Sequence, residues 1–525
     1  MVRTIFIILS IVVIAVFGGL GYFVNPNYYY WFILFAPLIL IGIRDITQTK
    51  HAIKKNFPVI GNLRYILESI SPEIQQYFVE RRTDGAPIDK NQRAIIYQRS
   101  KNIGASHPFG TEQDLYKEGY EFIVQSLYPA KIPHEEPRIL IGGDECTQPY
   151  SASIYNISAM SFGSLSQNAV MALNKGAQKG NFFHNTGEGG ISPYHLMGGD
   201  LCWQVGTGYF GCRAEDGTFS DEKFIENATK PEVKLIEVKL SQGAKPGHGG
   251  VLPGKKVTDE IAKIRGVEAG KTVLSPPGHS SFNSPEGLLK FVQKLRKISG
   301  GKPTGFKLCV GNPKEFEDIC KAMVSTNIFP DFISIDGSEG GTGAAPLEFA
   351  NHVGLPLYIG LTLATELLKK YNIRDKIKIN ASGKTFTGFG MIKSIALGAD
   401  FCSTARAMML SIGCIHAQLC NTNTCPVGVA TQDKRLMKGL DVTDKSERAY
   451  NFHKNTVHAF LELMAATGAK HPNEIKRSSI MRMAEDGDVH TMDEIVNAWN
   501  CKKKFIDGKA VGTDLGNGGQ VSVQL

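Results

Sequence analysis

Three cysteines stand close together in the segment SIGCIHAQLCNTNTCPVGVATQD, residues 411–433. Cys414, Cys420 and Cys425 are separated by five and then by four residues. Thiolates bind zinc, copper(I) or iron–sulfur clusters, but zinc sites usually begin with cysteines about two to four residues apart. Pro426, directly after the last cysteine, is typical of an iron–sulfur loop. The spacing therefore predicts an iron–sulfur cluster of the [3Fe–4S] type, with three buried core cysteines as the alternative.

Two turns upstream of these cysteines could bind a phosphate group. They are NASGKTFTGFG (380–390) and FCSTARAMM (401–409). Backbone N–H groups at such turns, together with the start of a helix, bind anions, and Lys384 or Arg406 could add positive charge. Because this phosphate site would lie next to a redox cluster, we predict that the phosphate belongs to FMN.

The region 151–470 alternates short β-branched runs with helical stretches. The expected strands include 157–162, 235–240, 306–310, 332–338, 376–382 and 401–406. The expected helices include 166–178, 285–299, 314–325, 361–372 and 387–398. This alternation predicts βα units with a parallel sheet, and a strand count near eight favours an α/β fold of the (β/α)8 TIM-barrel type. A doubly wound sheet is the alternative, but no G-x-G-x-x-G motif supports a Rossmann NAD site.

Two apolar runs open the chain, residues 4–23 and 28–43. The first has the length of about 20 residues that a bilayer span needs. Basic residues follow the second run and place that end in the cytoplasm by the positive-inside rule. They are Arg44, Lys50, Lys54, Lys55 and Arg64. We therefore expect a two-span anchor in the inner (cytoplasmic) membrane with the catalytic domain in the cytoplasm. A cleaved signal peptide is the rival reading, but no small-x-small cleavage site precedes the second run.

The chain has 525 residues, of which 42% are hydrophobic and 21% charged, as in a globular protein with a membrane segment. The expected domains are a transmembrane hairpin (1–48), an adaptor (49–150), a barrel (151–470) carrying the cysteine segment 411–433, and a C-terminal extension (471–525). A net charge of +8 without a long Lys/Arg run predicts no nucleic-acid partner. The helical pattern at 446–469 could pack on the barrel or form a contact in a homo-oligomer.

Taken together, the motifs resemble the synthase domain of glutamate synthases. The three cysteines followed by PVGVATQD are similar to the [3Fe–4S] loop of that family, and further similar motifs stand in the family's order. They are SAMSFGSLS (158–166), NTGEGG (185–190), QVGTGYFG (204–211), QGAKPGHGGVLPG (242–254), SPPGHSS (275–281) and DGSEGGTGAAP (336–346). The resemblance implies an FMN-binding barrel with the cluster beside the flavin. It also implies an oxidoreductase acting on CH–NH2 donors, which reduces the imino acid formed from 2-oxoglutarate and ammonia to glutamate.

Residue types and the resemblance together suggest cofactor contacts. Lys307 lies between apolar residues of an expected strand, where a lysine is rarely left unpaired, and could place a charge beside the flavin N1 and C2 carbonyl. A surface lysine is the alternative. The resemblance implies that Gln204 faces the pyrimidine edge. The other cofactor candidates are Met160, Ser161 and Ser164 at the ring, Gly383, Lys384 and Thr404 toward the phosphate, and Gly337 and Ser382 at the ends of expected strands.

The resemblance also implies substrate contacts. A 2-oxo acid with two carboxylates requires fixed cations, and Lys245 and Arg265 match family positions that hold 2-oxoglutarate. Glu188 matches a family glutamate near the reaction site and could move protons if its pKa is raised. A capping carboxylate in a glycine turn is the alternative for Glu188.

The chain departs from the family in two respects. His248 replaces a glutamate, and Val251 replaces a glutamine that contacts the oxo acid, so a buried donor to the substrate is lost. No glutaminase region or NAD(P)H site is visible, so we expect free ammonia, another amine or a partner subunit, and an external electron donor such as ferredoxin, another flavoprotein or a quinol. An amine or amino-acid dehydrogenase or transferase is one alternative function. A membrane-bound electron-transfer subunit without a substrate is the other.

Overall fold

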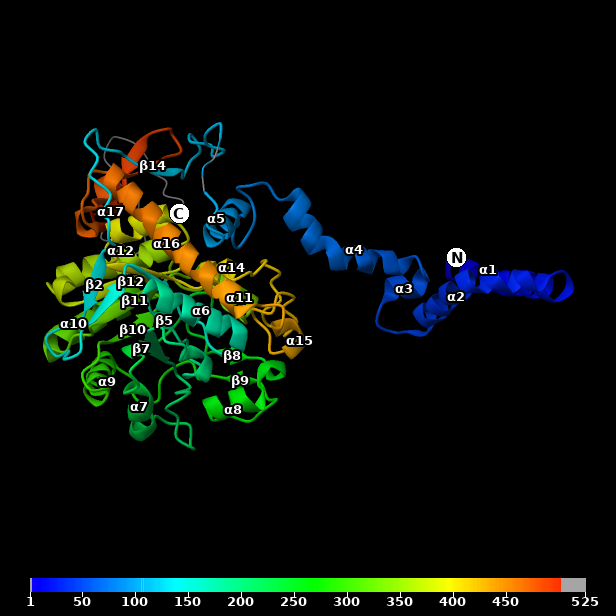
Figure 1. Cartoon of the computed structure of the whole chain (residues 1–525), viewed down its shortest axis with the longest axis horizontal. Coiled ribbons are helices and arrows are strands. Elements are labelled where there is room, and N and C mark those ends of the chain that lie inside the picture. Colours follow the sequence, from blue (N-terminus) through cyan, green and yellow to red (C-terminus); the bar gives the residue numbers. More distant parts are fainter. Residues whose placement is uncertain (1, 105, 107, 502–525) are drawn as a thin grey trace. The chain divides into compact units, whose positions relative to one another are not determined.

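The protein is described from a computed structural model, which covers residues 2–104, 106 and 108–501 (Figure 1). The chain divides into two compact units, Met1–Lys90 and Asn91–Leu525. The domain boundaries expected at residues 48, 150 and 470 remain predictions. The C-terminal part of the expected extension, residues 502–525, lies outside the described residues.

The first unit begins with two apolar helices, α1 (Val2–Phe23) and α2 (Phe32–Thr47), joined by η1 (Pro26–Trp31). Both the α1 segment and the segment Pro26–Thr47 are long and apolar enough to cross a membrane. Gly42 allows α2 to approach α1 closely, since a Cβ atom there would lie 1.9 Å from the Phe6 ring. The short helices that follow are α3 (Ala52–Asn56), α4 (Gly61–Ile74) and η2 (Gln75–Val79). Length and composition are compatible with the predicted anchor, which stays a prediction.

The second unit is built around a closed barrel with the strand order β10-β11-β12-β13-β4-β5-β6-β7, and neighbouring strands are parallel. The strands are β4 (Tyr155–Ile157), β5 (His184–Asn185), β6 (Leu201–Val205), β7 (Val233–Lys239), β10 (Thr304–Leu308), β11 (Phe332–Asp336), β12 (Lys378–Ser382) and β13 (Phe401–Thr404). This arrangement confirms the predicted TIM barrel. The doubly wound alternative is wrong because it would leave the sheet open.

Helices follow the barrel strands and cover the outside of the barrel (Figure 1). They are α6 (Gln167–Gly180), α7 (Asp221–Ala228), α9 (Pro285–Ile298), α10 (Pro313–Thr326), α12 (Leu357–Lys370), α13 (Gly388–Ala396) and α14 (Arg406–Ser411). Three further helices lie in the segments between these elements: α8 (Asp259–Arg265), α11 (Leu347–His352) and α15 (Lys434–Met437). Several begin at a Ser, Thr or Asn whose side chain accepts a backbone N–H of the first turn, as Ser166 does for α6 and Thr387 for α13. The sequence thus marks these helix starts locally.

Two details of the expected strands need correction. The strand expected at 157–162 is β4, which ends at Ile157, so most of that stretch is the loop that follows the strand. Strands β5 and β6 were not expected. β5 has only two residues and lies directly before the glycines of NTGEGG, so it is too short to produce an alternating pattern.

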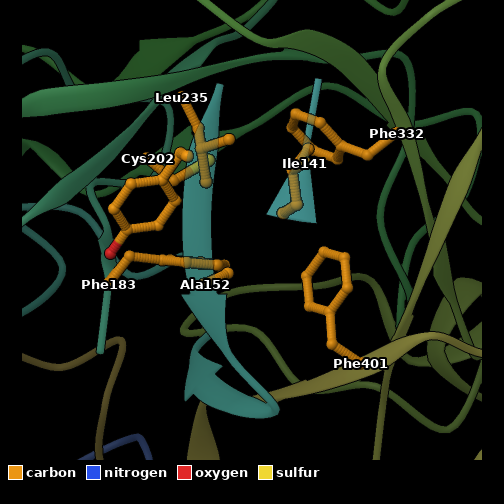
Figure 2. Close-up of a cluster of buried hydrophobic side chains, with 8 residues drawn as sticks. Ile141, Ala152, Phe183, Cys202, Leu235, Phe332 and Phe401 are labelled. Atoms are coloured by element: carbon orange, nitrogen blue, oxygen red, sulfur yellow. The ribbon is translucent and has the colours of Figure 1, made fainter. Parts of the chain in front are cut away.

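The inward positions of the strands change from apolar to polar along the barrel, because alternate residues of a strand face the same side. At one end, first inward residues such as Phe332 and Phe401 pack with the antiparallel hairpin of β2 (Arg138–Ile141) and β3 (Tyr150–Ser153) (Figure 2). Further along the same faces lie Glu237 and Ser334, and the last inward residues are polar or charged. They include Lys239, Lys307, Asp336 and Ser382. The hydrophobic core therefore fills the N-terminal end of the barrel, and the polar and charged side chains gather at its C-terminal end.

The C-terminal region packs on the barrel. Helix α16 (Val442–Ala466) lies against α6, where Gly176 faces Ala449 (Figure 1). The packing expected for the helical pattern at 446–469 is therefore observed, and its role in a homo-oligomer stays a prediction. Strand β1 (Glu121–Ile123) pairs with β14 (Ile480–Met483), which pairs with β15 (Val489–Thr491) before α17 (Met492–Cys501). The remaining short strands are β8 (Val251–Leu252) and β9 (Val273–Leu274), and α5 spans Lys90–Ser100.

Candidate active site

A buried ion pair stands at the C-terminal end of the barrel. Lys307 of β10 lies 3.2 Å, Nζ to Oδ2, from Asp336 at the end of β11. The same carboxylate oxygen accepts the Gly243 N–H at 2.9 Å. Burial lowers the pKa of Lys307, but the carboxylates of Asp336 and Glu237 outweigh that effect, and the pKa lies above its ordinary value. Lys307 is therefore a permanent buried cation and not a surface lysine.

A cavity opens beside this ion pair, with an empty volume of about 450 Å³ that includes space open to solvent. Its walls come from the ends of several strands and the loops after them. The lining residues are Ser158, Ala159, Gln204, Lys239, Gln242, Lys307, Asp336, Gly340, Gly341, Ser382, Gly383, Ala405 and Arg406. The position and the polar walls are those of a barrel active site.

The cavity includes some of the predicted cofactor residues and not others. Gln204, Lys307, Ser382 and Gly383 line it. Six candidates do not: Met160, Ser161, Ser164, Gly337, Lys384 and Thr404, although several are chain neighbours of lining residues. The Gln204 amide nitrogen donates to Glu237 Oε2 at 3.0 Å, and the Ser382 and Ser158 hydroxyls lie 2.9 Å apart.

The wall formed by β12, β13 and their loops retains unused hydrogen-bonding capacity. The hydroxyls of Ser403 and Thr385 are buried and have no hydrogen-bond partner. Arg406 lines the cavity and donates to the Glu339 carbonyl at 2.6 Å. Neither hydroxyl lines the cavity, but Arg406, Ser382 and the glycines Gly340, Gly341 and Gly383 do, and a cation beside glycine turns is consistent with an anionic ligand group at this wall.

A second group of charges adjoins the cavity and centres on Glu188. Lys239, which lines the cavity, lies 3.0 Å, Nζ to Oε2, from Glu188. Lys245 is buried and donates to the Ala344 carbonyl at 2.8 Å. Arg265 is buried beneath the loop after β4, where it donates to Ser161 Oγ at 3.2 Å. The structure thus brings together Glu188, Lys245 and Arg265, which are far apart in the sequence.

The pKa of Glu188 is shifted in the direction opposite to the one considered from the sequence. Burial raises the pKa of Glu188, but Lys239, Arg265 and Lys245 together lower the pKa below its ordinary value. The condition of a raised pKa, under which Glu188 could donate a proton, is therefore not met, and Glu188 is a carboxylate at neutral pH. Burial, with repulsion from Lys239, lowers the pKa of Lys245 to about 8, and burial lowers the pKa of Arg265 to about 10.

Sequence reasoning missed Lys239 and Glu237. Both lie on the inward face of β7 (VKLIEVK), two positions apart, and both are almost fully buried. Lys239 is the register partner of Lys307 on the neighbouring strand. The signal that singled out Lys307, a charged residue within an apolar strand, is equally present in β7 and would have found both residues.

The Glu188 side chain packs between Gly206 and Gly250. A substitution at Gly250 tests this packing directly. A Cβ atom on Gly250 would lie 2.0 Å from Glu188 Oε1 and 3.1 Å from Ser275 Oγ. We expect Gly250→Ala to push the carboxylate away from Lys239 and to lower the free energy of unfolding by about 1–3 kcal/mol, as overpacking does. Chemical denaturation measures this change.

Gly278→Ala is the matched control, because a Cβ atom there meets nothing within 4 Å and the backbone conformation suits an alanine. Equal stability of the two alanine variants would contradict the tight seating of Glu188.

The cysteine loop (residues 411–433) follows β13 and packs against the β4 loop (residues 158–166). The Gln432 side chain donates to the Gly163 and Leu165 carbonyls at 3.1 and 2.8 Å, and the Ser166 hydroxyl donates to the Gly428 carbonyl at 2.6 Å. Burial raises the pKa of Cys414 to about 12 and raises that of Cys420, with further contributions from the neighbouring thiols. The three thiols are therefore electrostatic neighbours beside a loop of the candidate site.

Among the described residues, no three His, Cys, Asp or Glu side chains are placed to hold a single metal ion. An iron–sulfur cluster needs a different arrangement. Each thiolate binds a different iron, so the sulfur atoms lie further apart than the ligands of a single metal ion. Cys425 is buried, whereas Cys414 and Cys420 are half-buried. Three neighbouring thiols on one loop are compatible with such an arrangement, and the cluster stays a prediction.

The two departures from the resembled motifs also have defined places. Val251 is half-buried in β8 and pairs with Leu274 of β9, next to Gly250. His248 is half-buried, its ring contacts the Phe349 ring edge-on, and its Nδ1 lies 2.8 Å from the Gly249 carbonyl. Both residues thus lie on the segment that contacts Glu188 through Gly250.

Comparison with known proteins adds to this geometry. Residues 125–470 match the family described as the conserved region in glutamate synthase. The chain is 38% identical over 510 residues to the glutamate synthase large subunit-like protein YerD of Bacillus subtilis, covering 89% of this chain and 97% of that protein. It is 35% identical to an archaeal-type glutamate synthase [NADPH] of Thermotoga neapolitana, covering 59% of this chain but 58% of the relative. A solved flavocytochrome b2 variant aligns with 14% identity and a TM-score of 0.41, covering 88% of this chain and 93% of that one, a likeness too distant to bear on function.

Proposed function

We infer the function from the premise that this chain belongs to the glutamate synthase family. It is a glutamate synthase-type oxidoreductase that acts on CH–NH2 donors. We propose that it reduces the imino acid formed from 2-oxoglutarate and ammonia to glutamate, with FMN and a [3Fe–4S] cluster as cofactors. The observation that carries the proposal is the pair of adjacent charge groups at the cavity, Lys307 with Asp336 and Lys239 with Glu188.

The residues around the cavity fit a flavin nucleotide. Bound FMN would supply the reducing electrons for the imino carbon. Lys307 would hold a positive charge beside the pyrimidine edge of the flavin, with Gln204 as a second polar contact. Ser382, Gly383 and Arg406 would face the phosphate, since all three line the same wall of the cavity beside glycine turns. Flavin would thus bind between the two charge groups and the loops after β12 and β13.

The substrate would bind through its carboxylates. Lys245 and Arg265 are fixed by the Ala344 carbonyl and by the β4 loop, so they would attract an anionic 2-oxo acid without a large loss of side-chain freedom. Lys239, held between Glu188 and Gln242, adds a third cation near the cavity. As a carboxylate, Glu188 could accept a proton or orient an ammonium group but would not donate a proton at neutral pH.

The affinity for the oxo acid should depend on pH through Lys245. With a pKa of about 8, Lys245 is charged below that pH and becomes neutral above it. We therefore expect the Kd for 2-oxoglutarate to be constant below pH 8 and to rise above it. Isothermal titration over pH 6.5–9.5 measures the profile, and Lys245→Gln should bind weakly with a flat profile. A Kd that does not change across pH 8 in the unaltered protein would count against Lys245 as a substrate contact.

The proposal also includes the source of the electrons and the location of the protein in the cell. The cluster would receive single electrons from an external donor, for which ferredoxin, another flavoprotein and a membrane quinol are the candidates. The two apolar N-terminal helices would anchor the protein in the inner membrane, with the barrel in the cytoplasm. Membrane fractionation and protease accessibility in intact and opened cells would test that location.

An anaerobic half-reaction tests the function. The detergent-solubilised protein is reduced chemically, and the flavin absorbance is followed after 2-oxoglutarate and ammonia are added together or separately. We expect fast reoxidation only with both, and glutamate as the product. Bound flavin that reoxidises with a different imino acid or amine would favour the dehydrogenase or transferase alternative. Bound flavin that no oxo acid reoxidises would favour an electron-transfer subunit, and absence of flavin would overturn the proposal.

A further inference from the structure

Lys256 links the cysteine loop to the β4 loop. It ends the short helix η4 (Gly254–Lys256), and its side chain is almost completely buried, with 2% exposed. Its ammonium group donates to the Ser164 carbonyl at 2.6 Å and to the Cys420 carbonyl at 3.2 Å. One cation therefore contacts a predicted cluster ligand and a predicted flavin-loop residue at once.

The surroundings of Lys256 contain no carboxylate at ion-pair distance within the described part of the chain. The titratable groups nearest to its side chain are Cys420, Cys425 and the guanidinium of Arg265. A buried ammonium without an anionic partner is costly. Two carbonyls satisfy part of its hydrogen-bonding capacity, but its charge requires a negative group on the side of the cysteines.

A cluster held by three thiolates would supply that negative group. Each electron added to such a cluster increases its negative charge, and a nearby cation in a buried site stabilises the reduced form. We propose that Lys256 is a positioning residue that fixes the cysteine loop against the β4 loop and raises the reduction potential of the cluster. The inference rests on the cluster assigned under the proposed function.

The structure also provides contacts that separate the charge of Lys256 from its role in packing. Gln432 joins the same two loops through two hydrogen bonds and carries no charge. Lys255 is the chain neighbour of Lys256, but its side chain is exposed. Removing the Gln432 contacts weakens the packing without a change in charge, and removing the Lys255 charge alters the net charge without a buried contact.

The test compares Lys256→Gln with Lys256→Arg, Lys255→Gln and Gln432→Leu in the full-length, cluster-loaded protein. Iron content and the EPR signal of the oxidised cluster establish loading, and an EPR-monitored redox titration gives the potential. We expect Lys256→Gln to lower the equilibrium constant for cluster reduction about tenfold, a shift of about 59 mV toward negative values. The other three variants should keep the potential of the unaltered protein.

Each outcome decides between the two proposals. Absence of iron in the unaltered protein would overturn the cluster and this inference together, whatever the flavin does. A loaded Lys256→Gln protein with an unchanged potential, or an equal shift in Gln432→Leu, would overturn the inference alone. If Lys256→Gln fails to bind the cluster while Lys256→Arg binds it normally, the positive charge is required for the cluster, and this result supports the inference. If neither Lys256→Gln nor Lys256→Arg binds the cluster, the shape of the lysine and not its charge is required, and the inference is overturned.

Discussion

Replacing Lys307 by methionine should lower the free energy of unfolding by about 3–5 kcal/mol, because removal of one partner leaves a buried charge uncompensated. Asp336, whose side chain is almost fully buried, would keep a single strong donor, the Gly243 N–H. The same change should remove flavin from the purified protein, since Lys307 lines the cavity beside Asp336. Chemical denaturation and the flavin-to-protein absorbance ratio measure the two effects.

A second substitution distinguishes charge from packing. In Lys307→Met/Asp336→Asn the unpaired carboxylate is gone, so we expect most of the lost stability to return while flavin binding stays weak. Lys314 on the outer helix α10 offers a control, because Lys314→Met removes an equal charge without a buried partner. If Lys307→Met unfolds at the same denaturant concentration as the unaltered protein, the buried ion pair is not the organising contact of the site.

Replacing Cys420 by serine should eliminate the cluster. A serine oxygen is a hard ligand, whereas iron in sulfide clusters prefers thiolate sulfur. Iron should fall from about three atoms per chain, the number in a [3Fe–4S] cluster, to the background of the preparation, while flavin is retained. The anaerobic reoxidation of already reduced flavin should persist, but reduction by an external one-electron donor should be lost. Iron analysis and EPR measure the first effect, and stopped-flow absorbance measures the second.

Cys146 provides the matched cysteine control. It is also half-buried, but it lies near the N-terminal end of the barrel, where its thiol donates to the Gly301 carbonyl at 3.3 Å. Cys146→Ser preserves that hydrogen bond and should keep the full iron content. Equal iron loss in both variants would point to general instability, and full iron content in Cys420→Ser would contradict the ligand assignment.

Much of the fold could be predicted because it follows from local patterns. The alternation of β-branched runs with capped helices predicted the barrel, and β12 ends at Ser382 as expected, whereas β11 and β13 end at Asp336 and Thr404, two residues before their expected ends. The error at β4 has the same origin, since the run ISAMSF continues to look like a strand after the chain has turned into its loop at Ser158. Periodicity detects residue types and spacing but not the position at which pairing with a neighbour ends.

Residue types and spacing were also enough to select Lys307 and the three cysteines, whereas Lys245 and Arg265 were selected by the family resemblance. Tertiary structure decided how these residues are charged and which of them share a site. Glu188 is ionised because β7 brings Lys239 to it and α8 brings Arg265, and Lys256 joins two loops that are distant in the sequence. Ionisation depends on burial and on charges a few ångströms away, and only the closed barrel sets those distances.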